Sequence, residues 1–189
     1  MEFKQAYDIV MKHEGGYVND KTDRGGETYK GVARKFHGTW TGWKIIDDMK
    51  TKSGFPKSLD SNTTLQSYVR SFYKEKFWDS NKIGYINNSS IQLELFDTGV
   101  NMGTSRAAKF FQEALNLCNR NQQDYPDIKV DGDIGRGTLS AYNRSRPASV
   151  FKTMNLLQGE LYMNIIRRSP SQEKFFNGWL NRVDIRFNV

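Results

Sequence analysis

Residues 13–32 gather the side chains best suited to acid–base chemistry. Within this segment, Glu14 shares the apolar face of a predicted helix with residues at helical spacing before it, Phe3, Tyr7 and Val10. Glu14 also lies in the last turn of that helix, where the helix dipole opposes a negative charge. Because burial and the dipole both favour the neutral acid, we expect a raised pKa and a general acid near neutral pH. The alternative is a structural carboxylate that accepts hydrogen bonds from the glycine-rich turn that follows.

A general acid that acts on a glycosidic bond normally works with a second carboxylate, which activates water or attacks the sugar. Asp20 and Asp23 follow Glu14 closely enough to serve. The glycines at 25–26 let the chain fold back and leave room for a bulky ligand, so that Asp23 or Thr28 can face Glu14. Asp20 is the alternative second carboxylate, although an Asx turn is the simpler explanation of it.

The elements that must position these residues follow from the apolar periodicity, which predicts a mainly α chain of the α+β class. The paired glycines at 15–16 end the first helix, and a small β-hairpin follows, with 17–18 on one side and 28–29 on the other. Residues 39–49 are predicted as a loose aromatic section and 53–60 as a surface connection. Further helices are predicted at 63–78, 90–102 with Ser90 as N-cap, 105–117 with Thr104 as N-cap, 136–143, 147–168 and the first half of 171–187.

The charge of the chain indicates an anionic binding partner but does not identify it. The net charge is +7, and Lys and Arg outnumber Asp and Glu by 15 to 13 in residues 1–100 and by 13 to 8 in residues 101–189. Such an excess favours nucleic acid, anionic lipid or an anionic cell wall, or is simply a solvated basic surface. The charged first residues do not resemble a secretory signal, and no segment reaches the ~20 apolar residues of a membrane span. We therefore expect a chain made in the cytoplasm without a signal peptide.

The run EGGYVNDKTDRGGETYKGV closely resembles the signature of glycoside hydrolase family 108, the N-acetylmuramidases of phage endolysins and bacterial autolysins. The shared pattern is approximately E-G-G-Y-x-N-D-P-x-D-x-G-G-x-T-x-x-G-I, from which Lys21 and Val32 depart. The resemblance implies a lysozyme-like helical fold and makes Glu14 the catalytic acid. The order glutamate, aspartate, threonine is also similar to that of phage-type lysozymes, which implies that Asp23 and Thr28 are the analogous pair.

Three later runs, LFDTGVNMGTSRAAKFFQEALN, VDGDIGRGTLSAYN and FFNGWLNRVD, resemble the C-terminal peptidoglycan-binding region that accompanies this hydrolase. The resemblance implies a hydrolase region at 1–95 and a helical peptidoglycan-binding region at 96–189, closely packed together. The secretion activators described among relatives of this family also make a secretion-associated role an alternative.

Further substrate contacts are predicted outside the acid motif. Asp97 and Asn101 lie four residues apart and project from one side of their helix, towards either a cleft or a neighbouring helix. Most aromatic residues at helical spacing belong to a core, and Trp78, at a predicted helix end, is the one assigned to sugar stacking. The predicted substrate-binding set is completed by residues of the motif: Tyr17, Asp20, Gly25 and Gly26.

No metal or cofactor is expected. The two histidines lack metal-ligand spacing, and the acidic residues at 131–133 lack the order and the closing glutamate of a calcium loop.

The sequence therefore predicts a peptidoglycan hydrolase that cleaves the bond between N-acetylmuramic acid and N-acetylglucosamine, with Glu14 as general acid. A lytic transglycosylase and a non-catalytic cell-wall-binding or secretion-associated protein are the alternatives. We expect bacterial peptidoglycan as the partner, no nucleic acid and a monomeric chain. It would act at the cell wall or in the periplasm, after prophage release or non-classical export.

Overall fold

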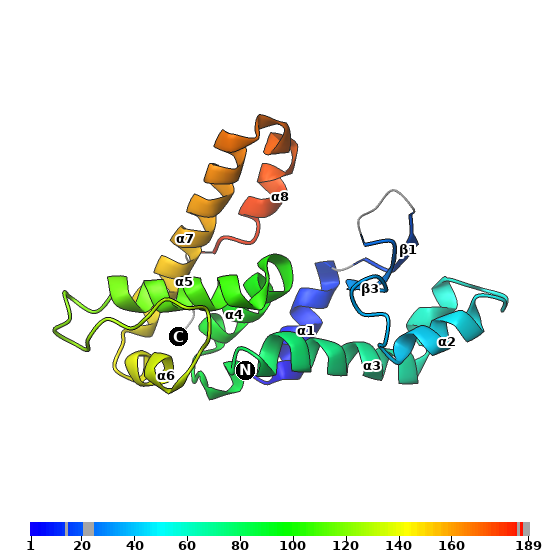
Figure 1. Cartoon of the computed structure of the whole chain (residues 1–189), viewed down its shortest axis with the longest axis horizontal. Coiled ribbons are helices and arrows are strands. Elements are labelled where there is room, and N and C mark those ends of the chain that lie inside the picture. The colour runs from blue at the N-terminus through cyan, green and yellow to red at the C-terminus, as the bar shows by residue number, and fades with distance from the viewer. Residues whose placement is uncertain (14, 21–24, 185, 187–189) are drawn as a thin grey trace. The chain divides into compact units, whose positions relative to one another are not determined.

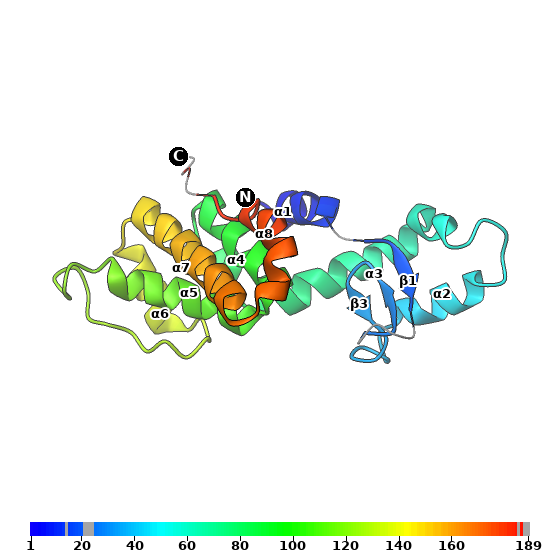
Figure 2. The same cartoon turned by 90° about the horizontal axis from the view of Figure 1, so that it is seen from above.

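The computed structural model describes residues 1–13, 15–20, 25–184 and 186 (Figure 1). The chain divides into two compact units. The smaller unit is Phe3–Lys76, and the larger unit joins Met1–Glu2 to Phe77–Val189. The smaller unit contains a three-stranded sheet and three α-helices, and the larger unit is built from helices (Figure 2).

The smaller unit begins with a helix and continues into the small sheet. Its elements in chain order are α1 (Phe3–Val10), the 3-10 helix η1 (Met11–His13), β1 (Tyr17–Asn19), β2 (Glu27–Tyr29), β3 (Val32–Ala33), α2 (Gly42–Met49), η2 (Lys57–Ser61) and α3 (Thr63–Tyr73). The apolar stripe predicted for α1 is confirmed, because Ala6, Tyr7 and Val10 are all buried. The Tyr7 ring packs edge-on against Tyr73 of α3, with centroids 5.8 Å apart.

The predicted hairpin is confirmed in its register. Residues 17–18 of β1 pair antiparallel with 28–29 of β2, and a third strand, β3, pairs with β2 on its other side. The turn between β2 and β3 consists of Lys30 and Gly31, which have φ of +42° and +74°. Positive φ at both positions is typical of a type I′ turn. The sequence reasoning missed β3 because lysine is not a residue that signals this turn.

The helix α2 was also missed, since residues 39–49 were predicted to form no element. This short helix buries Trp43 and Ile46, and it starts at Gly42, directly beneath the ring of Trp40. A Cβ at Gly42 would lie 2.2 Å from the ring carbon Cη2 of Trp40, so the helix can begin there only with glycine. Glycine at this position is therefore required by the packing of an aromatic ring.

The larger unit contains the longest helices of the chain. After the π-helix η3 (Lys74–Asp79), along which the chain passes between the units, come η4 (Ile83–Tyr85), α4 (Ser89–Met102), α5 (Thr104–Leu117), α6 (Arg136–Asn143), α7 (Pro147–Arg168), η5 (Pro170–Phe175) and α8 (Phe176–Leu180). The bounds predicted for α6 and α7 are confirmed. The helix α5 packs against both α4 and α7, and its residues Ala107, Ala108 and Phe111 are fully buried.

Two predicted N-caps are wrong by one or two residues. The side chain of Asn88 accepts a hydrogen bond from the Ile91 amide at 3.0 Å, so it caps α4 instead of Ser90. Gly103 precedes α5 and takes the N-cap position predicted for Thr104. The mainly α fold with a small β-hairpin after the first helix is nevertheless confirmed. None of the helices within the described residues is long and apolar enough to cross a membrane.

The loop before α6 is organised by one buried side chain, that of Gln112 on α5. Its amide Nε2 donates to Asp131 Oδ1 and to the Asp133 carbonyl, both at 2.9 Å, and its Oε1 accepts from the Gly132 amide at 2.8 Å. Gly132 has φ of +83°, and a Cβ there would lie 2.4 Å from Ser105 Oγ and 2.9 Å from the Ser105 carbonyl oxygen. The acidic loop is thus a structural turn held against α5.

We expect Gly132→Ala to lower the free energy of unfolding by about 1–3 kcal/mol, because alanine disfavours positive φ and its Cβ meets backbone. Gly137→Ala is the matched control, since Gly137 lies inside α6 and its Cβ position has no described atom within 4 Å. The control should be neutral or up to about 1 kcal/mol more stable. Urea unfolding followed by circular dichroism measures both; equal stability of Gly132→Ala and wild type would contradict the role of the loop.

Candidate active site

The hairpin has two faces with different environments. Successive side chains of a strand point to opposite sides, so Thr28 and its partner Val18 share one face, while Glu27 and Tyr29 share the other. Tyr29 is 1% exposed and Val18 is 48% exposed. We call the Thr28 side the outer face and the Glu27 side the inner face. Thr28 is half-buried on the outer face, and its hydroxyl donates to the Gly26 carbonyl at 3.3 Å.

Two glycines lie beside Thr28 at the start of β2. A Cβ at Gly25 would lie 3.2 Å from Thr28 Oγ1 and 3.4 Å from Ala33 Cβ, so glycine lets the chain pack closely on the outer face. Gly26 has φ of +62°, and no described atom lies within 4 Å of the position of its absent Cβ. The predicted space for a ligand at this pair is consistent with that opening and stays a prediction.

The predicted catalytic residues Glu14 and Asp23 lie outside the described residues. The described chain nearest to them is helical before Glu14 and belongs to the sheet elsewhere: η1 ends at His13, β1 begins at Tyr17, and residues 21–24 fall between β1 and β2. The Gly16 carbonyl accepts from the Lys30 amide at 3.2 Å, which extends the pairing towards Glu14 by one residue. The segment that follows Glu14 and the strands on either side of residues 21–24 therefore belong to the same small sheet as Thr28. Asp20, at the end of β1, is exposed.

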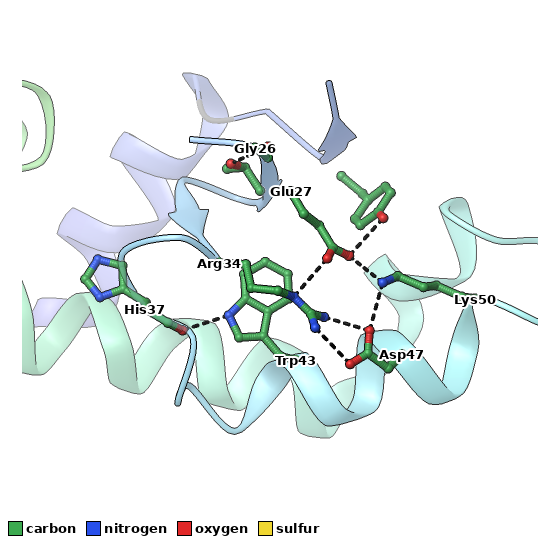
Figure 3. A network of polar contacts seen from close by, with 9 residues as sticks. Gly26, Glu27, Arg34, His37, Trp43, Asp47 and Lys50 are labelled. Carbon is green, nitrogen blue, oxygen red and sulfur yellow. Dashed lines mark hydrogen bonds and ion pairs between the residues drawn. The ribbon is translucent and has the colours of Figure 1, made fainter. Parts of the chain in front are cut away.

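The inner face is fixed by the carboxylate of Glu27, whose side chain is only 12% exposed (Figure 3). Three groups surround it: Arg34 Nε at 2.8 Å from Oε2, and Lys50 Nζ at 2.7 Å and the Tyr17 hydroxyl at 2.9 Å from Oε1. Because a carboxylate withdrawn from water requires paired charge and hydrogen bonds, these contacts compensate its burial. They also connect β2 to β1, to the segment after β3 and to the end of α2.

Arg34 and Lys50 are shared with a second acid, Asp47 of α2 (Figure 3). The Arg34 guanidinium donates to both Asp47 oxygens, from Nη1 at 3.0 Å and from Nη2 at 2.7 Å, and Lys50 Nζ lies 2.8 Å from Asp47 Oδ1. The guanidinium also stacks on the Trp43 ring, 4.4 Å from its centroid, and the Trp43 Nε1 donates to the His37 carbonyl at 2.8 Å. The hydrogen bonds from Arg34, followed by those from Lys50, lower the pKa of Asp47 to about 2.

Tyr17, predicted to bind substrate, has an internal partner in the structure. Its hydroxyl is the third donor to Glu27, and its ring packs edge-on against Phe55 with centroids 4.8 Å apart. Burial, and then the hydrogen bond to Glu27, raises the pKa of Tyr17. The Tyr17 ring is half-buried, and both of these contacts lie on the inner face of the hairpin.

Trp78, predicted to stack on a sugar, lies in the core of the larger unit. It is 5% exposed, and its ring packs edge-on against Phe96 of α4 with centroids 5.8 Å apart. A sugar that stacks on tryptophan needs an accessible ring face, and this structure gives Trp78 almost none. The prediction therefore gains no support.

Asp97 and Asn101, predicted as a pair on one side of their helix, do lie together at the end of α4. Asp97 Oδ1 accepts from Arg182 Nη1 at 2.7 Å, and the Asn101 amide Nδ2 donates to the Asp97 backbone carbonyl at 2.8 Å. Asn101 is exposed and lines a groove of about 350 Å³, together with Arg182 and residues of α5, α7 and α8. Asp97 thus orients an arginine at the edge of that groove.

One buried acid of the larger unit was not singled out by the sequence reasoning. Glu94 lies on α4, and burial raises its pKa to about 7, although the Thr98 hydroxyl donates to its Oε1 at 3.0 Å. The Thr98 oxygen in turn accepts from Gln158 Nε2 of α7 at 3.1 Å. The sequence signal that could have identified Glu94 is a charged residue within the apolar stripe of a helix.

Across the described part of the chain, no group of three or more His, Cys, Asp or Glu could hold a metal ion.

We expect the stabilisation from Asp47 to disappear in acid. A carboxyl with a folded pKa of about 2 and an unfolded pKa of ~3.9 stabilises the fold above pH ~4, and that contribution is lost as the pH falls towards 2. Because the Asp47 side chain is 46% exposed, Asp47→Asn should cost no more than about 1 kcal/mol at pH 7. Urea unfolding at pH 7, 4 and 2.5 should show the difference from wild type shrinking with pH.

Asp48→Asn is the matched control, because Asp48 is the exposed neighbour and makes no ion pair within the described residues. Its difference from wild type should stay the same across this pH range. A difference for Asp47→Asn that is also independent of pH would contradict the role of the Arg34 and Lys50 contacts.

Comparison with known proteins bears on both units. Residues 7–103 match the family model described as Glycosyl hydrolase 108, and residues 106–184 match the one described as Predicted Peptidoglycan domain. Among solved structures, "Structure of Brucella abortus SagA" has a TM-score of 0.62 and 20% identity over 96% of this chain and 88% of that chain, a likeness of fold alone. No curated protein matches the chain. Since the first match covers just over half of the 189 residues, the chain belongs to glycosyl hydrolase family 108.

Proposed function

We propose that this chain is an N-acetylmuramidase, which hydrolyses the bond between N-acetylmuramic acid and N-acetylglucosamine in bacterial peptidoglycan. The observation that carries the proposal is the match of a glycosyl hydrolase family and of a peptidoglycan domain to consecutive parts of one chain. A glycosyl hydrolase that carries a peptidoglycan domain is expected to act on peptidoglycan. The proposal goes one step further and specifies which bond between the two sugars is cleaved. A role as a phage endolysin or autolysin fits this activity.

Glu14 is the proposed general acid, which protonates the glycosidic oxygen as the bond breaks. Asp23 holds or activates the attacking water, with Thr28 beside it, and Asp20 is the alternative carboxylate. The position of Thr28 supports this assignment, because its hydroxyl lies half-buried on the outer face, next to the glycines at 25–26. In this arrangement the contacts on the inner face fix the position of the hairpin, and the catalytic residues lie on the outer face.

The stereochemistry follows from the separation of the two carboxyl groups. A separation of roughly 6.5–9.5 Å leaves room for water and gives inversion, whereas about 5 Å places the second carboxylate for direct attack and retention. With Asp23 acting on water, we propose inversion. We also propose that residues 1–95 form the hydrolase region and that residues 96–189 form a helical region that binds peptidoglycan. The chain acts as a monomer.

Glu14→Gln keeps the shape of the side chain and removes the acidic proton. Lysis of purified sacculi, followed by turbidity, should fall by at least about 100-fold, which is the usual contribution of a general acid. Glu75→Gln is the control, because Glu75 is an exposed acid outside the hairpin and should leave lysis unchanged. Circular dichroism of both variants should match wild type. Lysis by Glu14→Gln at the wild-type rate would reject the role of Glu14.

Mass spectrometry of the soluble products separates the proposal from its alternatives. A muramidase adds water and yields reducing N-acetylmuramic acid ends, and NMR of the fresh product should show the inverted anomer. Products with 1,6-anhydro ends would instead identify a lytic transglycosylase. Sacculi that bind the wild-type chain without dissolving would identify a non-catalytic wall-binding protein. Either of these two results would overturn the muramidase proposal.

A further inference from the structure

A groove in the larger unit lies where the end of α4, the start of α5 and the helices α7 and α8 meet. Its volume is about 350 Å³, at the lower end of the range for sites that bind small ligands. In Figures 1 and 2, α8 runs beside the C-terminal half of α7, and both helices contribute to this groove. The residues that define its chemistry are Asn101, Arg106, Leu161, Ile165, Trp179 and Arg182.

One wall of the groove is apolar and held in place by stacked rings. The Trp179 ring lies nearly parallel to Tyr162, with centroids 5.2 Å apart and planes at 22°, and nearly parallel to Phe175 at 6.2 Å and 26°. Tyr162 is buried, so it anchors the stack to the core of the unit. Leu161 and Ile165 of α7 are half-buried and extend this wall. Such a wall contacts methyl and methylene groups of a ligand without first having to become ordered.

The lining of the groove also includes two arginines, which give it positive charge. Arg106 of α5 is exposed, and among the described residues no carboxylate pairs with it. Arg182 is held by Asp97 through one nitrogen, and because a guanidinium carries five N–H donors, others stay available to a ligand. A second groove of about 340 Å³ shares Arg106 and is also lined by Lys109. The two grooves together favour a ligand that carries carboxylates.

We propose that this groove binds the acidic peptide stem of peptidoglycan. The inference rests on the proposed function, since it names the part of the polymer that the C-terminal region recognises. The glycan strand offers hydroxyl and acetamido groups, which are neutral. The peptide stem offers free carboxylates beside alanine methyl groups, and this combination matches an arginine-lined groove with an apolar wall. Arg106 and Arg182 bind a carboxylate, and Asn101 hydrogen-bonds the peptide backbone.

The roles of two residues on α4 follow from this placement. Asp97 is a positioning residue, because it fixes the Arg182 guanidinium through the hydrogen bond of 2.7 Å. Asn101 is a contact residue, because its exposed side chain lines the groove while its Nδ2 is oriented by the Asp97 carbonyl.

Another hollow of the same unit, of about 820 Å³, is lined by Asp79, Lys82, Tyr85 and Arg136 among others. It suits an acidic ligand less well. The Lys82 amine already donates to the Ile134 carbonyl and lies 3.4 Å from Asp133 Oδ1, and Asp79 adds a negative charge. Its Arg136 therefore provides a matched control for Arg106, since both are exposed arginines that line a hollow of one unit.

Isothermal titration of the full chain with purified disaccharide–tetrapeptide tests the proposal. Wild type should bind, and binding should weaken with added salt. Arg106→Ala should weaken the affinity at least about tenfold, as expected for loss of a charged hydrogen bond to a carboxylate. Asn101→Asp keeps the shape and adds a repelling charge, so it should weaken binding as well. Arg136→Ala should bind like wild type. Thermal unfolding of each variant checks that the fold is intact.

Two further probes identify the part of the ligand that is recognised. The free tetrapeptide should bind with the same dependence on Arg106, whereas oligomers of N-acetylglucosamine, which carry hydroxyl and acetamido groups but no carboxylate, should not bind in the groove. The proposal is overturned if N-acetylglucosamine oligomers bind as well as the muropeptide, if Arg106→Ala has no effect, or if only Arg136→Ala weakens binding.

Turbidity of sacculi separates this inference from the proposed function. If the chain binds muropeptide through Arg106 but does not lyse sacculi, the groove proposal is supported and the hydrolase proposal is contradicted. If the chain lyses sacculi but shows no Arg106-dependent binding, the hydrolase proposal is supported and the groove proposal is contradicted.

Discussion

The smaller unit depends on the compensation of one carboxylate that has been withdrawn from water. The Tyr17 hydroxyl, Arg34 and Lys50 compensate the withdrawal of the Glu27 carboxylate from water. Because these contacts join β2 to β1, to the segment after β3 and to the end of α2, they fix the position of the hairpin on α2. The opposite face of the same strand carries Thr28 and is free of this constraint. One strand thereby combines a rigid support with an accessible surface, as a catalytic site on a short hairpin requires.

In the larger unit, buried polar side chains that need hydrogen-bond partners likewise restrict how the helices pack. Glu94, Thr98 and Gln158 form a buried chain of hydrogen bonds between α4 and α7, and Gln112 holds the loop before α6 against α5. Apolar faces alone would allow helices to slide or rotate with little cost. Buried polar groups allow only the arrangement in which each finds its partner. These hydrogen bonds also hold together two of the helices that line the groove near Trp179.

Much of this could be predicted where the signal is local. The bounds of α6 and α7 follow from apolar stripes, and the hairpin register follows from short strands that flank a glycine-rich connection. The helix α2 and the strand β3 were missed because their reasons are non-local: a ring packed on Gly42, and a turn whose Lys30 is held by Asp60 and Gln66. The role of Glu27 was missed likewise, since Arg34 and Lys50 are distant in sequence. The boundary at 95/96 falls within α4 and stays a prediction, as do the roles of Glu14 and Asp23.

With catalysis proposed on the hairpin and peptide recognition proposed in the groove, this division of chemistry has a physical reason. Peptidoglycan is an insoluble polymer with repeating peptide stems, so a hydrolase gains more from staying near the surface than from tight binding of a single repeat. A groove with an accessible arginine and a solvent-exposed rim gives binding that is weak enough to release and salt-dependent. In the proposed arrangement, linking such a groove to the hairpin raises the effective concentration of cleavable bonds without any new contact to the sugar. Recognition of the peptide would then leave the hairpin to be complementary to the transition state of the sugar bond alone.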